Sequence, residues 1–250
     1  MHPVHRIYEW WLGRALSGGP RPRHVGLVMD GNRRWARAQG LVDPNLGHRA
    51  GAEHVEAVLG WCREWGIGQV TVYVASVDNL RKRDAAEVGH LLHVVETVVA
   101  GRLARPDGVW RVHLAGRLDL LPDSTRHALK LAEDRTSHLA SGSEVTIAIG
   151  YDGRIEVVDA LRSLLHDEAA RGGDLRELAG RITEEEIAAH LYTAGRPEAD
   201  LVIRTSGEQR LSGFLLWQSA RARLHFCDAN WPGFRKVDFL RALRAFARRG

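Results

Sequence analysis

The sequence lacks the features that define several large classes of protein. Only two of its 250 residues are cysteines, Cys62 and Cys227, and they form no Cys-x-x-Cys pair. Their separation argues against a disulfide framework or a zinc site and indicates a reducing cytoplasm. No apolar run approaches the roughly 18 residues of a membrane-spanning helix, and the chain has no glycine–lysine loop of the Walker type. A transmembrane protein and an enzyme of nucleoside triphosphates are therefore disfavoured.

The chain also lacks a strong charge of one sign. It has 35 lysines and arginines against 31 aspartates and glutamates, a formal net charge of +4. This mild excess suits an anionic small molecule or a membrane surface, and part of it fits ordinary solvent-facing arginines. Nucleic acid is disfavoured as a partner, because no aromatic residues alternate with the basic ones as nucleic-acid stacking platforms do.

The first 22 residues are predicted to form a short amphipathic helix and a linker. The helical pattern ends at Gly18-Gly19, and it lacks the apolar core and cleavage site of a signal peptide. We expect the helix to pack on the body of the protein, and peripheral contact with a membrane is the alternative. Its apolar positions are Val4, Ile7, Tyr8, Trp11 and Leu12.

Over the rest of the chain, short β-rich runs alternate with longer helical patterns. This alternation predicts one α/β domain over 23–250, with a mostly parallel sheet flanked by helices. The runs cover 24–29, 69–75, 109–115, 144–149, 201–204 and 223–227, and the helical patterns lie near 47–65, 84–104, 123–139, 153–171, 183–190 and 235–248.

Ligands of open parallel sheets bind beyond the carboxyl ends of the strands, where this chain has three polar segments. They are MDGNRRW (29–35), SVDNLRKR (76–83) and RTSGEQRLSG (204–213). In the first, Gly31 permits a sharp turn, Arg33 and Arg34 suit phosphate, and Asp30 suggests a bridging Mg²⁺. The alternative is a helix cap followed by solvated arginines.

The segment RTSGEQRLSG offers a second phosphate cradle through Arg204, Ser206, Arg210 and Ser212. The alternative is a turn followed by a helix over 211–222, with the arginines in surface ion pairs. An apolar stripe on the helix over 84–104 is ordinary core, or it lines a cavity beside the cradles. The stripe consists of Val88, Leu91, Leu92, Val95, Val98, Val99 and Leu103.

Four motifs closely resemble those of the cis-prenyltransferases, the family of undecaprenyl diphosphate synthase. The resemblance runs from about residue 23 to 246 and is closest to the actinobacterial short-chain Z-farnesyl diphosphate synthases. It implies a six-stranded parallel sheet, a homodimer, an apolar tunnel and the joining of an allylic diphosphate to a second isoprenoid diphosphate. The motifs are HVGLVMDGNRRWARAQG (24–40), GHRAG (47–51), ADLVIRTSGEQRLSGFLLWQ (199–218) and NWPGF (230–234).

The resemblance also implies roles for individual residues. The expected catalytic residues are Asp30, which is also the expected metal ligand, Asn32, Ser76 and Asn79. Those expected to contact substrate are Gly31, Arg33, Arg34, Trp35, His48, Asp78, Arg83, Arg204, Arg210, Ser212 and Arg223.

Two departures from the family pattern affect the expected chemistry. Asp78 stands where the family usually has glutamate, and an additional residue nearby lets either Lys82 or Arg83 take the place of the family arginine. Arg223 replaces the glutamate that usually helps to hold Mg²⁺, so we hypothesise that it partly replaces the ion and changes the Mg²⁺ dependence. Head-to-middle coupling of two allylic diphosphates to a branched, lavandulyl-type product is therefore an alternative to head-to-tail elongation.

A non-catalytic accessory subunit is the alternative from another class of protein. Such subunits typically lose the phosphate-binding motifs, and both motifs are intact in this chain. The sequence therefore favours an enzyme.

Overall fold

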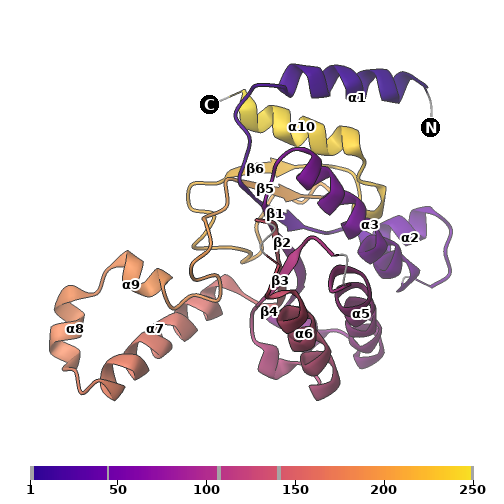
Figure 1. Ribbon diagram of the computed structural model, residues 1–250. Helices are drawn as coiled ribbons and strands as arrows, with labels where there is room; N and C mark the ends of the chain where they lie inside the picture. The colour runs from indigo at the N-terminus through magenta and orange to yellow at the C-terminus, as the bar shows by residue number, and fades with distance from the viewer. Residues whose placement is uncertain (1–2, 44, 106–107, 140–141, 249–250) are drawn as a thin grey trace.

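A computed structural model describes residues 3–43, 45–105, 108–139 and 142–248. Six strands form one sheet in the order β3-β4-β2-β1-β5-β6, and all neighbouring strands run parallel (Figure 1). The predicted α/β fold with a six-stranded parallel sheet is confirmed. The strands are β1 (His24–Val28), β2 (Gln69–Ser76), β3 (Arg111–Ala115), β4 (Glu144–Tyr151), β5 (Leu201–Arg204) and β6 (Arg223–Phe226).

The central strands are buried on both faces, which explains why they appear in the sequence as continuous apolar runs. Side chains such as Leu27 and Ile203 join the main core, whereas their neighbours Val28 and Val202 join a smaller cluster closed by Phe214. The helices that contribute to the main core include α3 (Asn45–Glu64), α5 (Ala85–Val98), α6 (Asp123–Thr136) and α10 (Lys236–Ala247).

The remaining helices lie at the edges of this body. In Figure 1, α7, α8 and α9 project from it as an arm, defined here as residues 153–188. The sequence did not predict α4 and α8 as separate helices. These remaining helices are α1 (Pro3–Leu16), α2 (Asn32–Ala38), α4 (Val77–Lys82), α7 (Gly153–Ala170), α8 (Leu175–Arg181) and α9 (Glu184–Ala188).

Two helix predictions need correction. The segment 211–222 is a series of turns, because Ser212 and Leu215 have positive φ angles of 53° and 47°, which a right-handed helix excludes. The helix expected over 84–104 is α5 followed by a π-helical turn over Val99–Leu103. The wider π turn changes which side chains of this segment face the sheet.

The amino-terminal helix α1 packs on α10, as the sequence predicted. Leu12 and Leu16 of α1 are buried in the main core, with exposed fractions of 0% and 5%. The two terminal helices therefore lie side by side, with the chain ends at opposite ends of the pair (Figure 1). None of the helices in the described ranges has the length and apolar character needed to cross a membrane.

Candidate active site

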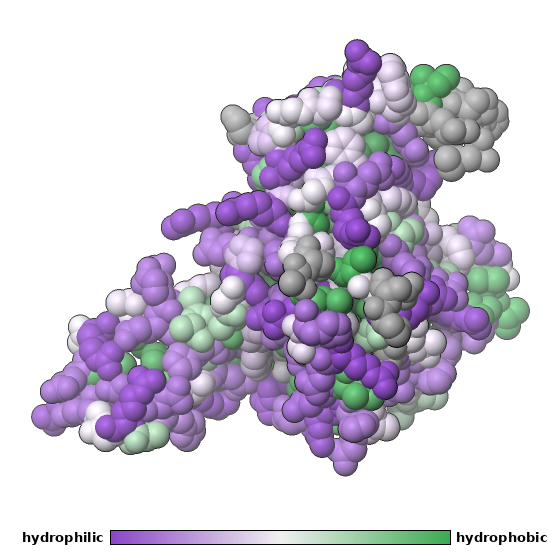
Figure 2. All heavy atoms as spheres, in the orientation of Figure 1, coloured by the Kyte–Doolittle hydropathy of each residue, from purple (hydrophilic) through white to green (hydrophobic). Residues whose placement is uncertain are grey.

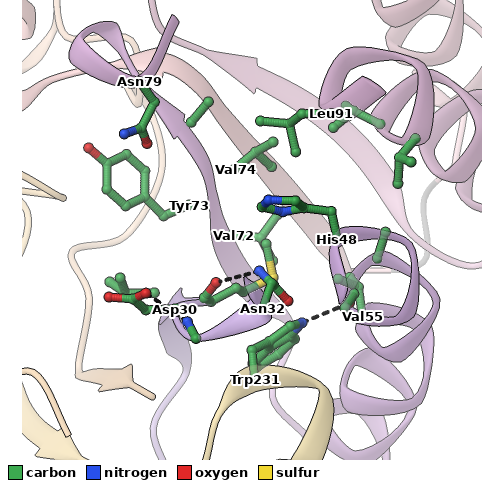
Figure 3. Close-up of a pocket in the computed structure, with 18 of the residues that line it drawn as sticks. Asp30, Asn32, His48, Val55, Val72, Tyr73, Val74, Asn79, Leu91 and Trp231 are labelled. Carbon is green, nitrogen blue, oxygen red and sulfur yellow. Dashed lines mark hydrogen bonds between the residues drawn. The ribbon is translucent and has the colours of Figure 1, made fainter. Parts of the chain in front are cut away.

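A cavity of about 580 Å³ opens at the carboxyl ends of β1, β2 and β5 (Figure 3). It brings together all three polar segments that the sequence singled out. Its mouth is polar and its interior is apolar, and Asp30 is the single carboxylate among the described lining residues. Six arginines line it, which favours a strongly anionic ligand. They are Arg33, Arg34, Arg37, Arg83, Arg204 and Arg210.

The first cradle is built where β1 turns into α2. Gly31 has a φ of 99°, and a Cβ there would lie 2.4 Å from Oδ1 of Asn230, so only glycine fits this turn. The turn places Asn32 beside the cavity, where its Nδ2 donates to the carbonyl of Met29 at 3.1 Å. Oδ1 of Asn32 is buried without a hydrogen-bond partner among the described residues and lies against Gly51.

The second cradle is built around Arg204, which is 5% exposed at the end of β5. Its Nη1 donates to Oγ of Ser212 at 2.8 Å and also to the carbonyl of Arg210. Arg210 itself is exposed and lies 3.4 Å from Glu208. Arg204 thus fixes the loop that presents Ser212 and Arg210 to the cavity.

Asp30 and two arginines join the cradles. Nη2 of Arg204 lies 2.9 Å from Oδ2 of Asp30, and Nη2 of Arg34 lies 3.7 Å from its Oδ1. Arg34 also donates to the carbonyl and Oγ of Ser206, at 3.0 and 2.7 Å. Each cradle therefore contributes an arginine to the same carboxylate.

Ser76 and Asn79 meet the cavity at the end of β2. They form a reciprocal cap on α4, because Oγ of Ser76 accepts from the amide of Asn79 at 2.9 Å and Oδ1 of Asn79 accepts from the amide of Ser76 at 3.3 Å. Tyr73 stands beside them, stacked on Phe214 with ring centroids 4.8 Å apart. Burial raises the pKa of Tyr73 to about 12, so its hydroxyl stays protonated at neutral pH.

His48 lies at the cavity wall among charged groups. Glu87 of α5 lies 3.0 Å from Arg83, 3.5 Å from Arg33 and 3.7 Å from Nε2 of His48. Burial is the main cause, and Arg83 the next, of a His48 pKa of about 4, which Glu87 only partly offsets. His48 is therefore a neutral imidazole at pH 7 when no ligand is bound.

The apolar interior uses the helical stripe predicted from the sequence. The stripe is not plain core, because five of its residues line the cavity: Leu91, Val95, Val98, Val99 and Leu103. Leu92 lies in the main core and Val88 packs against that core, and neither lines the cavity. The other apolar lining residues include Val55, Val72, Val74, Val94, Ile147 and Trp231.

Some predicted substrate contacts do not lie in the cavity of this chain. Asp78 is exposed and pairs with Lys82 at 2.7 Å, so Arg83 rather than Lys82 faces the cavity. Trp35 lies beside Gly233 and does not line the cavity. Arg223 pairs in register with Leu201, at the amino end of β6, and its Nη1 donates to the carbonyl of Phe246 at 2.8 Å.

Arg223 therefore faces away from the carboxyl ends of the strands. Neither Arg223 nor Asp78 lines the cavity of this chain, so their contact with substrate stays a prediction. Lining residues that the sequence did not single out include Tyr73, Arg37 and Trp231. Glu87, which organises the charged wall, was missed as well, because Arg83 lies between α4 and α5, where the spacing rule for a helix does not apply.

The donor set fits Mg²⁺ only as an ion shared with substrate. No group of three or more candidate metal ligands occurs within the described parts of the chain. Asp30 can supply one carboxylate. Mg²⁺ commonly binds through one or two carboxylates together with substrate phosphates and water, so Asp30 fits such an ion.

Comparisons with known proteins agree with this geometry. Residues 28–250 match the prenyltransferase family model described as undecaprenyl diphosphate synthase. The chain is 57% identical to an isoprenyl transferase of Streptomyces fradiae over 246 residues, which cover 98% of this chain and 95% of the relative. It is 53% identical to the (2Z,6E)-farnesyl diphosphate synthase of Thermobifida fusca over 245 residues, covering 98% and 94%.

Among solved structures, the lavandulyl diphosphate synthase of Lavandula x intermedia, in complex with dimethylallyl diphosphate, matches with a TM-score of 0.81. That match is 28% identical and covers 91% of this chain and 95% of the plant protein. A parallel sheet with paired arginine cradles above an apolar cavity defines a prenyl diphosphate transferase. The chain belongs to the undecaprenyl diphosphate synthase family of cis-prenyltransferases.

Proposed function

We propose that the protein elongates a short allylic diphosphate, such as dimethylallyl or geranyl diphosphate, head-to-tail with isopentenyl diphosphate to give a short Z-prenyl diphosphate. The observation that carries this proposal is the pair of arginine cradles at the mouth of one apolar cavity. Two diphosphate heads can bind side by side there, while one hydrocarbon chain occupies the interior. The farnesyl diphosphate synthase of Thermobifida fusca, 53% identical, supports a short product.

In the proposed reaction, Arg33, Arg34 and Asn32 hold the allylic diphosphate beside His48. The bond between its C1 and the diphosphate oxygen breaks, and inorganic diphosphate leaves with the electron pair. The double bond of isopentenyl diphosphate then forms the new carbon–carbon bond, and loss of a proton creates the new double bond. Guanidinium groups fixed before the reaction stabilise the charge that develops on the leaving group.

The attacking isopentenyl diphosphate is assigned to the second cradle. Arg204 and Ser212 are already fixed by their mutual hydrogen bond, and exposed Arg210 can exchange its ion pair with Glu208 for one with the diphosphate. Ser76 and Asn79 line the same cavity at the end of β2, where they would assist departure of diphosphate or transfer of the proton. Mg²⁺, bound by Asp30 together with substrate, would neutralise further charge on the leaving diphosphate.

Head-to-middle coupling has less support than head-to-tail elongation. It was inferred from Asp78 and Arg223 standing in place of two glutamates, and neither side chain lines the cavity. The lavandulyl diphosphate synthase is similar at only 28% identity. An accessory subunit is disfavoured, because both cradles have arginines aimed into the cavity.

A homodimer in the cytoplasm completes the proposal. Large apolar side chains stay exposed on the arm and on the edge strand β6, and such surfaces suit subunit contact. They are Val158, Leu165, Leu175 and Leu224, with exposed fractions between 44% and 60%.

The test is product analysis with dimethylallyl, geranyl and labelled isopentenyl diphosphate, each alone and in pairs. We expect a linear product only when isopentenyl diphosphate is present. A branched product from dimethylallyl diphosphate alone would replace the proposal by head-to-middle coupling. Addition of EDTA should abolish turnover, whereas full activity in excess EDTA would remove Mg²⁺ from the proposal. As a control, Arg221→Gln changes an exposed arginine outside the cavity and should leave turnover unchanged.

A further inference from the structure

The amino-terminal helix α1 is apolar on two opposite faces. Leu12 and Leu16, four residues apart, are buried against the body. Ile7, Trp10 and Trp11 lie on another face, with exposed fractions of 68%, 64% and 46%. A surface helix normally presents polar residues on its outer side, so this second apolar face calls for a partner.

The spacing of the exposed residues makes them one continuous strip. Ile7, Trp10, Trp11 and Arg14 follow the i, i+3, i+4, i+7 pattern of a single helix face. We call this strip the outer face of α1. In Figure 2, pale and green atoms lie among purple ones over the α1 end of the molecule.

Arginines frame the outer face. The guanidinium carbon of Arg14 lies 5.5 Å from the centre of the Trp10 ring, and that of Arg244 lies 4.9 Å from the Trp11 ring. Arg241 lies 5.4 Å from the ring of Tyr8 in the same way. These cations stand beside the indoles that would contact a partner.

The charge of this region is one-sided. The described side chains of α1 and of residues 236–248 include Lys236 and four arginines but only two acids, Glu9 and Asp238. Asp238 pairs with Arg241 at 3.1 Å, and Lys236 pairs with Glu64 of α3 at 2.6 Å, so the excess of positive charge rests on Arg14, Arg244 and Arg248. The complementary partner is therefore anionic as well as apolar.

We propose that the outer face of α1 docks the protein on the surface of an anionic lipid bilayer. Tryptophan rings bind at the interface between head groups and hydrocarbon, and arginines beside them pair with lipid phosphates. A helix of 14 residues is ~21 Å long, which is too short to span a core of roughly 30 Å, so α1 lies flat in the interface. The face lies outside the catalytic cavity, so this inference is independent of which prenyl product is made.

The test is co-sedimentation of the full chain with vesicles of phosphatidylglycerol, compared with vesicles of phosphatidylcholine, at low salt. We expect binding to the anionic vesicles only, and weaker binding as salt rises. The double variant Ile7→Gln/Trp10→Gln should bind at least about tenfold more weakly, because two apolar side chains no longer enter the interface. Arg14→Gln should weaken binding roughly fivefold.

The matched control is Val42→Gln/Leu131→Gln, which removes two exposed apolar side chains elsewhere and should bind as the wild type does. All variants should keep the wild-type turnover of soluble substrates, which shows that they are folded. If the double variant fails to fold, Arg14→Gln still decides the question.

Three results would overturn the inference. The first is that the wild type does not bind phosphatidylglycerol vesicles at low salt, and the second is that wild type and Arg14→Gln bind them equally. The third is that, without lipid, the double variant has a different molar mass from the wild type in light scattering. The last result would show that the outer face of α1 contacts another protein chain instead.

Discussion

With His48 replaced by glutamine, the protein should lose less of its free energy of unfolding on mild acidification than the wild type loses. His48 is 8% exposed and lies beside Arg83 and Arg33 on the cavity wall. Burial and these arginines lower its pKa from 6.5 to about 4 in the folded protein. In the unfolded chain the imidazole binds a proton near its ordinary pKa, so acid favours unfolding. The folded state therefore keeps its full stability with respect to His48 above about pH 6.5, and this stability is lost as the pH falls towards 4.

The magnitude follows from the two pKa values. Between pH 7 and pH 5, a shift from 6.5 to about 4 costs the folded state roughly 2 kcal/mol relative to the unfolded chain. The variant His48→Gln carries no titrating group at this position and escapes that cost. The buried histidines His24 and His54, whose pKa values are lowered by burial, are common to both proteins and cancel in the comparison.

The assay is urea unfolding of wild type and variant at pH 7 and at pH 5. The variant should lose roughly 2 kcal/mol less than the wild type over this range, whereas replacement of exposed His93 by glutamine should change nothing. Equal losses in wild type and His48→Gln would refute the reasoning, because His48 would then be charged at little cost. A bound diphosphate should raise the pKa of His48, so wild-type affinity for inorganic diphosphate should rise more than that of His48→Gln as the pH falls.

Three further substitutions test the cavity. Asp30→Asn removes the carboxylate partner of buried Arg204, and we expect turnover to fall by about 100-fold and urea-measured stability by about 1–3 kcal/mol. Arg37 lines the cavity and has no ion pair within the described chain. Arg37→Gln should therefore raise KM for the allylic diphosphate about tenfold and leave kcat little changed. An unchanged KM, or an equal rise in KM for Arg49→Gln, which lies outside the cavity, would contradict this prediction. Gly51→Ala would place a methyl group 2.1 Å from Oδ1 of Asn32. Thermal unfolding of this variant should show a free energy of unfolding lower by about 1–3 kcal/mol. A melting temperature equal to that of the wild type would disprove the close contact.

The sequence predicted the sheet and the edge at which ligands bind because both follow from local patterns. Continuous apolar runs mark parallel strands, and polar residues after them mark the carboxyl ends. The turn at Gly31 and the arginines after it were predictable for the same reason, since each depends on the preference of one residue for one conformation or charge partner. The meeting of the segments 29–35, 76–83 and 204–213 then follows from strand order.

What the sequence could not predict depends on contacts distant along the chain. The turns over 211–222 contain Leu215 with a positive φ, a cost that is offset because its side chain is fully buried against the sheet. The role of Glu87 depends on Arg33, which lies 54 residues earlier. Arg223 begins its predicted strand and lies at the amino end of β6, a position that the rule for carboxyl ends does not connect with the cavity.

The arginines around Asp30 connect the two substrates. Arg34 and Arg204 belong to different cradles and share one carboxylate, which is 36% exposed. An arriving diphosphate carries more negative charge than this carboxylate, so it competes for both guanidinium groups. As they turn to the substrate, the carboxylate loses its charge partners and becomes able to bind a cation. We therefore expect Asp30 to keep the arginines in place before substrate binds, and the affinity of the site for a metal to depend on the presence of diphosphate.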